Sequence, residues 1–253
     1  MQIYYENKSG VLYHGECLSV MHNFNDNSFD AVIADPPYSS GGLYLYNRKL
    51  SPKDKYIQSG TQKEYYTFVG DARDSHSWSF WSTIWITEAQ RLLKPGGYFF
   101  MFTDWRQLPA AADALQAGNI QWRGIIVWNK TSFARAPHKG YFRHQCEYVV
   151  WGSKGDLPVP AIGENDGPYD GCYSIMQNPK TKQHMTAKPG SLIEKLLAPI
   201  KCKQNPKVLD PFSGSGTVFC ACQNLGIHCT AIEISEDYCE VAKNRIENIF
   251  DNT

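Results

Sequence analysis

The chain has 253 residues, 42% of them hydrophobic, which is enough for one α/β domain with inserted segments. Its 25 basic and 25 acidic residues cancel, which excludes a general attraction to polyanions, so any nucleic-acid site must come from a local basic patch. Eight scattered cysteines include no CxxC pair, which favours reduced, buried thiols over disulfides or a zinc site. We find neither a signal peptide nor a membrane-spanning apolar run, and expect a cytoplasmic protein without a metal.

Apolar periodicity predicts strands and helices that alternate along most of the chain. Strands are expected at 11–15, 31–34, 98–102, 123–128, 146–151, 208–210 and 228–232. Helices are expected at 17–24, 80–93, 108–117, 191–197, 217–225 and 235–249, the last with Ser235 as its N-cap. Strands that alternate with helices favour a doubly wound, mostly parallel α/β sheet, here in a single domain over residues 1–253.

The apolar run at 31–34 stops at once in Asp35-Pro36-Pro37-Tyr38. Because proline cannot continue a strand ladder, the acid and the aromatic residue lie just past the carboxyl end of the strand, where open α/β sheets bind ligands. The Asp35 carboxylate and the Pro36 carbonyl can each accept a hydrogen bond from the exocyclic amino group of a nucleobase. This favours a pyramidal nitrogen with a free lone pair, and Tyr38 can stack on the base. A strand-end turn with a solvated acid is the alternative.

Two long stretches lack a clear period. Residues 39–79 leave directly from the Asp35 turn, so we predict a mobile loop over the site, with a solvated insertion as the alternative. Residues 131–183 are a candidate recognition insertion. The segment 121–150 has five basic residues and one acid, Glu147, with aromatic residues interleaved, which suits contacts to phosphates and bases but also fits a solvated loop. The candidate DNA contacts are Lys130, Arg135, His138, Lys139 and Arg143, with Arg48 and Lys49 from the first stretch.

A cofactor pattern lies near the carboxyl end, where a strand, a Gly-rich turn, a helix, a second strand and an acid follow one another. The turn reads Asp210-Pro211-Phe212-Ser213-Gly214-Ser215-Gly216-Thr217, and Glu233 comes 23 residues after Asp210. Glycines let backbone amides approach a ligand, and the acid after the next strand can hold ribose hydroxyls. An acid at the position of Asp210 repels a pyrophosphate and attracts a cation. The pattern therefore favours S-adenosylmethionine over a dinucleotide, and a turn that serves packing alone is the alternative.

Together these motifs resemble the DNA amino-methyltransferases, which methylate adenine N6 or cytosine N4. The Asp35 motif precedes the cofactor turn, and His184-Met185-Thr186-Ala187-Lys188-Pro189 lies just before that turn, an order that resembles the permuted β group. The resemblance covers most of the chain except 39–79 and 153–183, and it implies that Asp35, Pro36, Pro37 and Tyr38 are catalytic. It also implies cofactor contacts from Asp35, Lys188, Pro189, Asp210, Pro211, Phe212, Gly214, Ser215, Gly216, Thr217, Glu233 and Ile234.

One departure from the family pattern lies near the amino end. The family usually has Gly-Asp-Cys where this chain has Gly15-Glu16-Cys17, so Glu16 and Cys17 are candidates for the contact to the cofactor's adenine.

The resemblance implies transfer of a methyl group from S-adenosylmethionine to adenine N6 in double-stranded DNA, on a base flipped out of the duplex. Cytosine N4 is the nearest alternative, but cytosine enzymes more often carry Ser where Asp35 stands. Methylation of a protein glutamine is disfavoured because that motif usually begins with Asn and follows the cofactor turn. A cofactor-binding DNA module without catalysis is the alternative from another class. A second copy of the chain and a cognate restriction enzyme are further candidate partners.

This interpretation requires the strand tips at Asp35 and Asp210 to be neighbours in the sheet.

Overall fold

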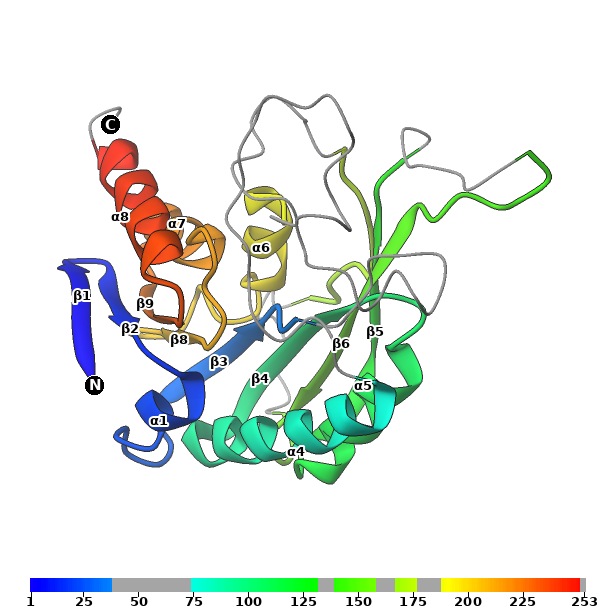
Figure 1. The fold of residues 1–253 in the computed structure, drawn as a ribbon, viewed down its shortest axis with the longest axis horizontal. Coiled ribbons are helices and arrows are strands. Elements are labelled where there is room, and N and C mark those ends of the chain that lie inside the picture. The colour runs from blue at the N-terminus through cyan, green and yellow to red at the C-terminus, as the bar shows by residue number, and fades with distance from the viewer. Residues whose placement is uncertain (38–73, 132–138, 158–166, 177–187, 251–253) are drawn as a thin grey trace.

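A nine-stranded mixed sheet forms the centre of the computed structural model, which describes residues 1–37, 74–131, 139–157, 167–176 and 188–250 (Figure 1). The strands are β1 (Gln2–Asn7), β2 (Gly10–His14), β3 (Phe29–Ala34), β4 (Leu93–Thr103), β5 (Gln121–Asn129), β6 (Cys146–Ser153), β7 (Cys172–Ser174), β8 (Lys207–Asp210) and β9 (His228–Glu233). Their order in the sheet is β1-β2-β9-β8-β3-β4-β6-β5-β7.

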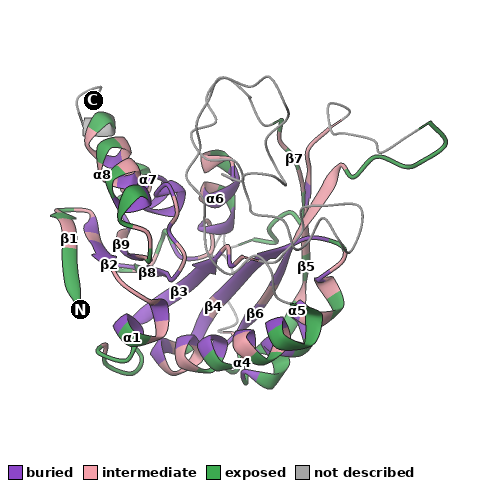
Figure 2. Ribbon diagram, viewed as in Figure 1, coloured by how far each residue is buried: buried purple, intermediate pink, exposed green. Residues whose placement is uncertain are grey.

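Helices cover both faces of this sheet, so the molecule has three layers (Figure 1). They are α1 (Cys17–Met21), α4 (Ser75–Leu92), α5 (Leu108–Ala117), α6 (Gly190–Leu196), α7 (Thr217–Leu225) and α8 (Glu236–Phe250). One core lies under α6, α7 and α8, and the other lies under α1, α4 and α5. The buried sheet between the two helix layers is the purple centre of Figure 2.

Strand β3 shows why the sequence folds this way. All six of its residues are buried, and from Ala31 to Ala34 its side chains alternate between the two cores. Ala31 and Ile33 belong to one core, whereas Phe29, Val32 and Ala34 belong to the other. Side chains alternate across a strand, so a strand covered by helices on both faces is apolar along most of its length. This explains the uninterrupted apolar run before Asp35. The one charged residue of β3, Asp30, is buried and pairs with Lys94 at 2.8 Å.

The central strands β2, β9, β8, β3 and β4 pair in parallel, and β6 runs antiparallel between β4 and β5. Strand β3 is hydrogen-bonded directly to β8, with Ala31 opposite Val208 and Val32 opposite Leu209. The carboxyl ends of these two strands therefore meet at the same edge of the sheet. This confirms the prediction that the tips at Asp35 and Asp210 are neighbours, and the doubly wound, mostly parallel fold is confirmed with it.

Several expected boundaries are wrong. Helix α4 begins at Ser75, inside the stretch expected to be a loop up to 79, because the Asp74 carboxylate accepts hydrogen bonds from the backbone N–H groups of His76 and Ser77 at 3.0 Å. Strand β1 was not predicted, and neither was β7, which lies within 153–183. Helix α1 ends at Met21, three residues before the expected end.

The expectation of buried thiols holds for five of the eight cysteines. Cys146 is half-buried, and Cys172 and Cys202 are exposed, so the expectation is wrong for these three. No helix among the described residues has both the length and the apolar character needed to span a bilayer.

Candidate active site

The Asp35 turn is held in place by the indole of Trp78. The Trp78 Nε1–H donates a hydrogen bond of 2.8 Å to the carbonyl oxygen of Pro37, and the Trp78 side chain, which belongs to α4, is fully buried. Two prolines stiffen the backbone at this point, and the indole fixes where the turn leaves the strand. Tyr38, the fourth residue of the predicted catalytic motif, lies outside the described residues.

The Asp35 carboxylate forms an ion pair with a lysine from a distant part of the sequence. The Lys188 Nζ donates to Asp35 Oδ1 at 2.9 Å and to Oδ2 at 2.8 Å. The Lys188 side chain is 5% exposed, whereas the Asp35 side chain is 28% exposed. Burial raises the pKa of Asp35, and the charge of Lys188 opposes that shift. The carboxylate is therefore accessible from one side and neutralised from the other.

A second acid extends this ion pair across the sheet. Glu147, at the start of β6, has its Oε2 atom 3.6 Å from the Lys188 Nζ and its Oε1 atom 3.0 Å from the Lys130 Nζ. Burial acts to raise the pKa of Glu147, but the charges of Lys188 and Lys130 outweigh it and leave the pKa below its usual value. Asp35, Lys188, Glu147 and Lys130 thus form a chain of alternating charges, which we call the Asp35–Lys130 charge network.

The sequence analysis predicted that Lys188 contacts the cofactor and that Lys130 contacts DNA, and it predicted no role for Glu147. In the structure both ammonium groups pair with half-buried carboxylates at the sheet edge. A single acid in a basic segment was the signal that could have pointed to Glu147.

Two further carboxylates lie at the adjacent strand tips. Asp210 is 1% exposed, and its Oδ1 accepts a hydrogen bond of 3.1 Å from the backbone N–H of Phe212. Burial raises its pKa well above the usual value, with the Asp35 and Glu233 charges acting in the same direction. The Glu233 carboxylate accepts from the backbone N–H groups of Gly214 at 2.7 Å and Ser235 at 2.8 Å. Both acids are therefore held by the backbone of the loops beside them.

The Gly-rich turn needs its glycines for two reasons. Gly214 has a backbone φ of 51° and Gly216 has a φ of 76°, values that residues other than glycine rarely adopt. A Cβ atom at Gly216 would lie 3.1 Å from the Cβ of Ala242, so the turn also packs closely against α8. Arg245 of α8 braces the same turn, because its Nη1 donates to the Thr217 hydroxyl at 2.9 Å.

Helix α4 connects the two motifs. Trp78 binds the Asp35 turn, and one and two turns farther along the helix Trp81 and Trp85 pack against Phe212 of the cofactor turn, with ring centroids 5.6 and 5.0 Å apart. The three tryptophans share one face of the helix. A single helix therefore supports the turn after β3 and the turn after β8, a role that the sequence pattern did not reveal.

The residues predicted to contact the cofactor's adenine lie at the end of β2, beside Glu233. The Gly15 N–H donates to the Glu233 carbonyl at 2.9 Å. The Glu16 carboxylate accepts from the backbone N–H groups of Leu18 at 3.1 Å and Ser19 at 2.9 Å, so it caps α1. Glutamate thus serves here as an N-cap, which accounts for an acid at this position independently of any ligand.

Pro189, Pro211, Ser215 and Ile234 complete the predicted cofactor set. Pro189 is the N-cap residue of α6, and Pro211 and Ser215 are buried in the turn after β8. Ile234 follows β9 and is 55% exposed, with its carbonyl oxygen 3.1 Å from the His14 Nε2.

Of the predicted DNA contacts, Lys139 and Arg143 are exposed in the connection between β5 and β6. The same connection carries two exposed aromatic side chains, Tyr141 at 64% and Phe142 at 96%. Arg48, Lys49, Arg135 and His138 lie outside the described residues.

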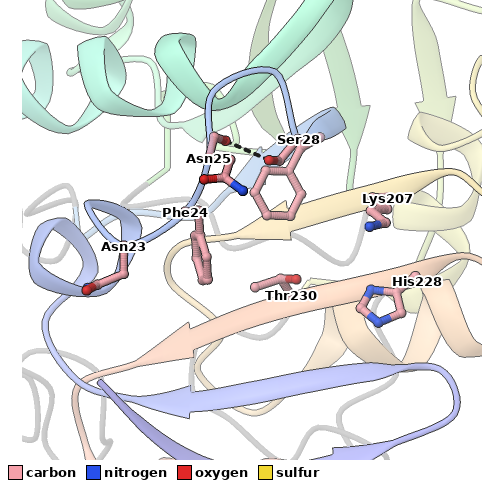
Figure 3. Close-up of a pocket in the computed structure, with 8 residues that line it drawn as sticks. Asn23, Phe24, Asn25, Ser28, Lys207, His228 and Thr230 are labelled. Carbon is pink, nitrogen blue, oxygen red and sulfur yellow. Dashed lines mark hydrogen bonds between the residues drawn. The ribbon is translucent and has the colours of Figure 1, made fainter.

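A pocket of about 230 Å³ opens elsewhere, at the amino ends of β8 and β9 (Figure 3). Lys207, His228 and Thr230 line it from these strands, and Phe24 lines it from the loop after α1. Asp210 and Glu233 end the same two strands at their carboxyl ends. This pocket therefore belongs to the opposite edge of the sheet from the carboxylates.

Comparison with known proteins places these motifs in a family. The sequence matches the family model for N6 and N4 methyltransferases, described as DNA methylase, over residues 29–244. The chain belongs to this DNA methylase family. Membership makes it a DNA methyltransferase, as the motifs predicted.

Curated relatives match the DNA methylase along nearly its whole length. Type II methyltransferase M2.LlaDCHI of Lactococcus lactis subsp. cremoris is 26% identical over 255 residues, which cover 96% of this chain and 91% of that protein. Type II methyltransferase M2.MboI of Moraxella bovis is 28% identical over 260 residues, which cover 96% of this chain and 90% of that protein.

Solved structures share the fold of the DNA methylase. The complex of M1.HpyAVI with SAM has a TM-score of 0.65 and 23% identity, and the match covers 93% of this chain and 98% of that one. PvuII DNA methyltransferase, which is cytosine-N4-specific, has a TM-score of 0.69 and 17% identity, covering 99% of this chain and 94% of that one. The fold is therefore shared with an enzyme that is specific for cytosine N4.

Proposed function

We propose that this DNA methyltransferase transfers the methyl group of S-adenosylmethionine to the exocyclic N6 of adenine in double-stranded DNA. The observation that carries the proposal is the pairing of β3 with β8, which puts the Asp35 turn beside the Asp210 turn. One carboxylate is then available for an amino group and the other for a cationic methyl donor, within reach of each other.

The residues around Asp210 fit S-adenosylmethionine. Asp210 and Glu233 are acids at adjacent strand tips, and the Ser213 hydroxyl is buried without a hydrogen-bond partner among the described residues. A buried hydroxyl without a partner is expected to have one when the ligand is bound. S-adenosylmethionine supplies an electrophilic methyl group on a sulfonium. Asp210 would attract its positive groups, Glu233 would hold its ribose hydroxyls, and Phe212, fixed between the tryptophans of α4, would border its adenine.

Asp35 acts on the nucleophile. Its carboxylate and the Pro36 carbonyl accept hydrogen bonds from the two N–H groups of the flipped base, which localises the lone pair on nitrogen. As the nitrogen gains a methyl group it loses one proton, and the Asp35 carboxylate is placed to accept that proton. Holding the amino group in a fixed orientation supplies much of the rate. Tyr38 remains our proposed stacking partner for the base.

The choice of adenine over cytosine depends on Asp35. An aspartate at this position is the family feature that favours adenine, whereas the fold gives no preference, since a cytosine-N4-specific enzyme shares it. Both curated relatives reported above are named Type II methyltransferases. We also propose that the protein acts in the cytoplasm within a restriction-modification system, with a cognate restriction enzyme as partner. We further propose that it forms a homodimer, which sedimentation analysis of the purified protein tests.

DNA is proposed to lie along the β5–β6 connection. Lys139 and Arg143 are exposed there and can neutralise phosphates, and Tyr141 and Phe142 expose rings that can contact bases. Lys130 is 23% exposed and is 3.0 Å from Glu147, so an internal ion pair competes with its proposed contact to DNA. Arg48, Lys49, Arg135 and His138 remain proposed contacts, with 39–79 as a loop over the site and 131–183 as the recognition segment.

The test is methylation of DNA by the purified chain with tritiated S-adenosylmethionine, followed by mass spectrometry of the nucleosides. We expect label in DNA and N6-methyladenine after digestion. N4-methylcytosine alone would overturn the choice of base. Cofactor binding without transfer to any DNA would favour the non-catalytic module.

A further inference from the structure

Lys188 occupies the position that the substrate amino group needs. Its Nζ contacts both carboxylate oxygens of Asp35, at 2.9 and 2.8 Å, and its side chain is almost fully buried. An amino group that donates to Asp35 must therefore share the carboxylate with Lys188 or displace it. This competition for Asp35 rests on the proposed transfer to a base nitrogen.

The ammonium also works against the charge that develops in the reaction. The amino nitrogen becomes positive as it takes the methyl group, and Asp35 stabilises that charge only while its own charge is not cancelled. In a site shielded from water, a cation in contact with both oxygens cancels much of the field of the carboxylate. The observed pairing therefore suits the enzyme without a base better than it suits the transfer step.

Glu147 offers Lys188 a second carboxylate. Its Oε2 lies 3.6 Å from the Lys188 Nζ, too far for a good hydrogen bond, and is buried without a hydrogen-bond partner in the described part of the chain. Its Oε1 is already held by Lys130 at 3.0 Å. A buried carboxylate oxygen without a donor is costly, so a short movement of Nζ toward Oε2 would satisfy it.

The path between the two acids is favourable to a cation. Strand β4 lies between β3 and β6 in the sheet, and the ring of Phe102 from β4 has its centroid 5.2 Å from the Lys188 Nζ. The face of an aromatic ring attracts an ammonium group at this distance. The Phe102 ring therefore stabilises the ammonium group in the space beside the two acids.

We propose that Glu147 is a positioning residue that receives the Lys188 ammonium when the target amino group binds Asp35. The lysine leaves one carboxylate and completes a hydrogen bond to the other, so the substrate amino group meets an uncompensated Asp35. No covalent bond changes in this step, and the total charge of the network stays the same.

Glu147→Gln tests the exchange because it removes the negative charge that would receive the Lys188 ammonium and keeps the shape of the side chain. We expect kcat to fall roughly 10- to 100-fold, the range for a lost hydrogen bond to a charged group. The KM for DNA and the Kd for S-adenosylmethionine should change less than about twofold, because phosphate contacts supply most of the affinity for DNA and Glu147 is not among the proposed cofactor contacts. A kcat at the wild-type level would overturn the proposal, since Lys188 would then share Asp35 with the base.

A double-mutant cycle with Lys188→Gln separates exchange from a merely structural role. When Lys188 is absent there is no cation to receive, so Glu147→Gln should lower kcat less than about twofold at saturating cofactor in that background. If Glu147 acts only by holding Lys130 or the start of β6, the full loss will persist without Lys188, and the exchange is wrong.

The matched control is Glu88→Gln. The Glu88 side chain is 18% exposed, close to the 20% of Glu147, and it pairs with Arg91 at 2.6 Å. This pair lies on the surface of α4, away from the strand tips. It should leave kcat unchanged.

Where Glu147→Gln does not fold, as judged by circular dichroism, Glu147→Asp replaces it in the same cycle. The shorter acid keeps the charge and should lower kcat severalfold, again only when Lys188 is present. Wild-type protein that fails to methylate DNA would refute the proposed function, whereas active wild-type protein with an equally active Glu147→Gln variant would refute the exchange alone.

Discussion

The neighbouring strand tips at this sheet edge hold their acids in two different ways. Asp35 is held by an ammonium group that comes from 153 residues farther along the chain, whereas Asp210 and Glu233 are held by backbone N–H groups of the loops beside them. Asp35 is also partly exposed, and Asp210 is not. The comparison separates a carboxylate with an exchangeable partner from carboxylates with fixed ones.

This difference fits the two tasks proposed for the tips. A backbone amide cannot leave its acceptor without unfolding the turn, so Asp210 and Glu233 present the same geometry to every ligand. A lysine side chain has four rotatable bonds and can change partners. A rigid tip suits a cofactor that binds in one way, and an exchangeable tip suits a base that arrives and departs in every cycle.

The largest effect is expected from Asp35→Ala, which removes the acceptor for the amino group. Transfer should fall by a factor of about 1,000 or more, as when one preorganised polar group is removed from an active site. The measurement is tritium transfer to DNA, with cofactor binding followed by calorimetry. Affinity for S-adenosylmethionine should be largely retained, and full activity in this variant would refute the role of Asp35.

Asp210→Asn should act on the other tip. Loss of its charge should weaken S-adenosylmethionine binding roughly 10- to 100-fold, the range for a hydrogen bond to a charged group, with a smaller effect on kcat at saturating cofactor. Calorimetry and initial rates separate the two quantities. Asp113→Asn, on the exposed side of α5, is the control. A large loss of kcat with unchanged affinity would mean that the two tips do not divide the work in this way.

Acid should affect both tips before it affects an ordinary aspartate. Burial raises the pKa of Asp35 and, more strongly, that of Asp210. Protonation therefore begins at a higher pH than in the unfolded chain, so kcat and cofactor affinity should both begin to fall at a higher pH than the titration of an ordinary aspartate predicts. The folded state binds these protons more tightly than the unfolded chain, so the two groups add stability as the pH falls. Rates that drop only together with a thermal unfolding signal would contradict this explanation.

A smaller effect is expected where α4 supports the Asp35 turn. Trp78→Phe removes the indole N–H that binds the Pro37 carbonyl and should cost about 1 kcal/mol of stability, with a severalfold lower kcat. Trp122→Phe is a control for the loss of the indole N–H alone, because the exposed Trp122 Nε1 also donates to a backbone carbonyl, that of Gly124 at 2.9 Å. Chemical denaturation and initial rates compare the two variants. Equal losses of kcat would show that the Trp78 bond has no special link to the site.

The smallest effects concern DNA affinity. Lys139→Ala and Arg143→Ala should each weaken DNA binding similarly for all sequences and lower the slope of log K against log salt by about 1, as for a single phosphate contact. Fluorescence anisotropy at several salt concentrations measures the slope. Lys201→Ala, an exposed lysine in the loop between α6 and β8, should leave it unchanged. An unchanged slope in both test variants would mean that DNA does not bind along the β5–β6 connection.

The sequence determined the fold class, the two strand-end motifs and their approximate limits. The reason is local: a fully apolar run that ends in Asp-Pro-Pro must be a buried strand followed by a turn, and Gly216 is required by its own backbone angle and close packing. Helices α5 and α7 match their predicted ranges because their ends are marked by glycine just beyond the last turn.

Tertiary structure alone decided which groups the acids meet. Nothing near Asp35 in the sequence indicates Lys188 or Glu147, because their contact follows from the strand order β8-β3-β4-β6. The role of α4 is similar, since Trp78, Trp81 and Trp85 have the spacing of an ordinary core-facing stripe, and only the packing shows that they support two motifs. Local geometry is encoded by neighbouring residues, whereas the charge balance of the site arises only when distant strands are brought together.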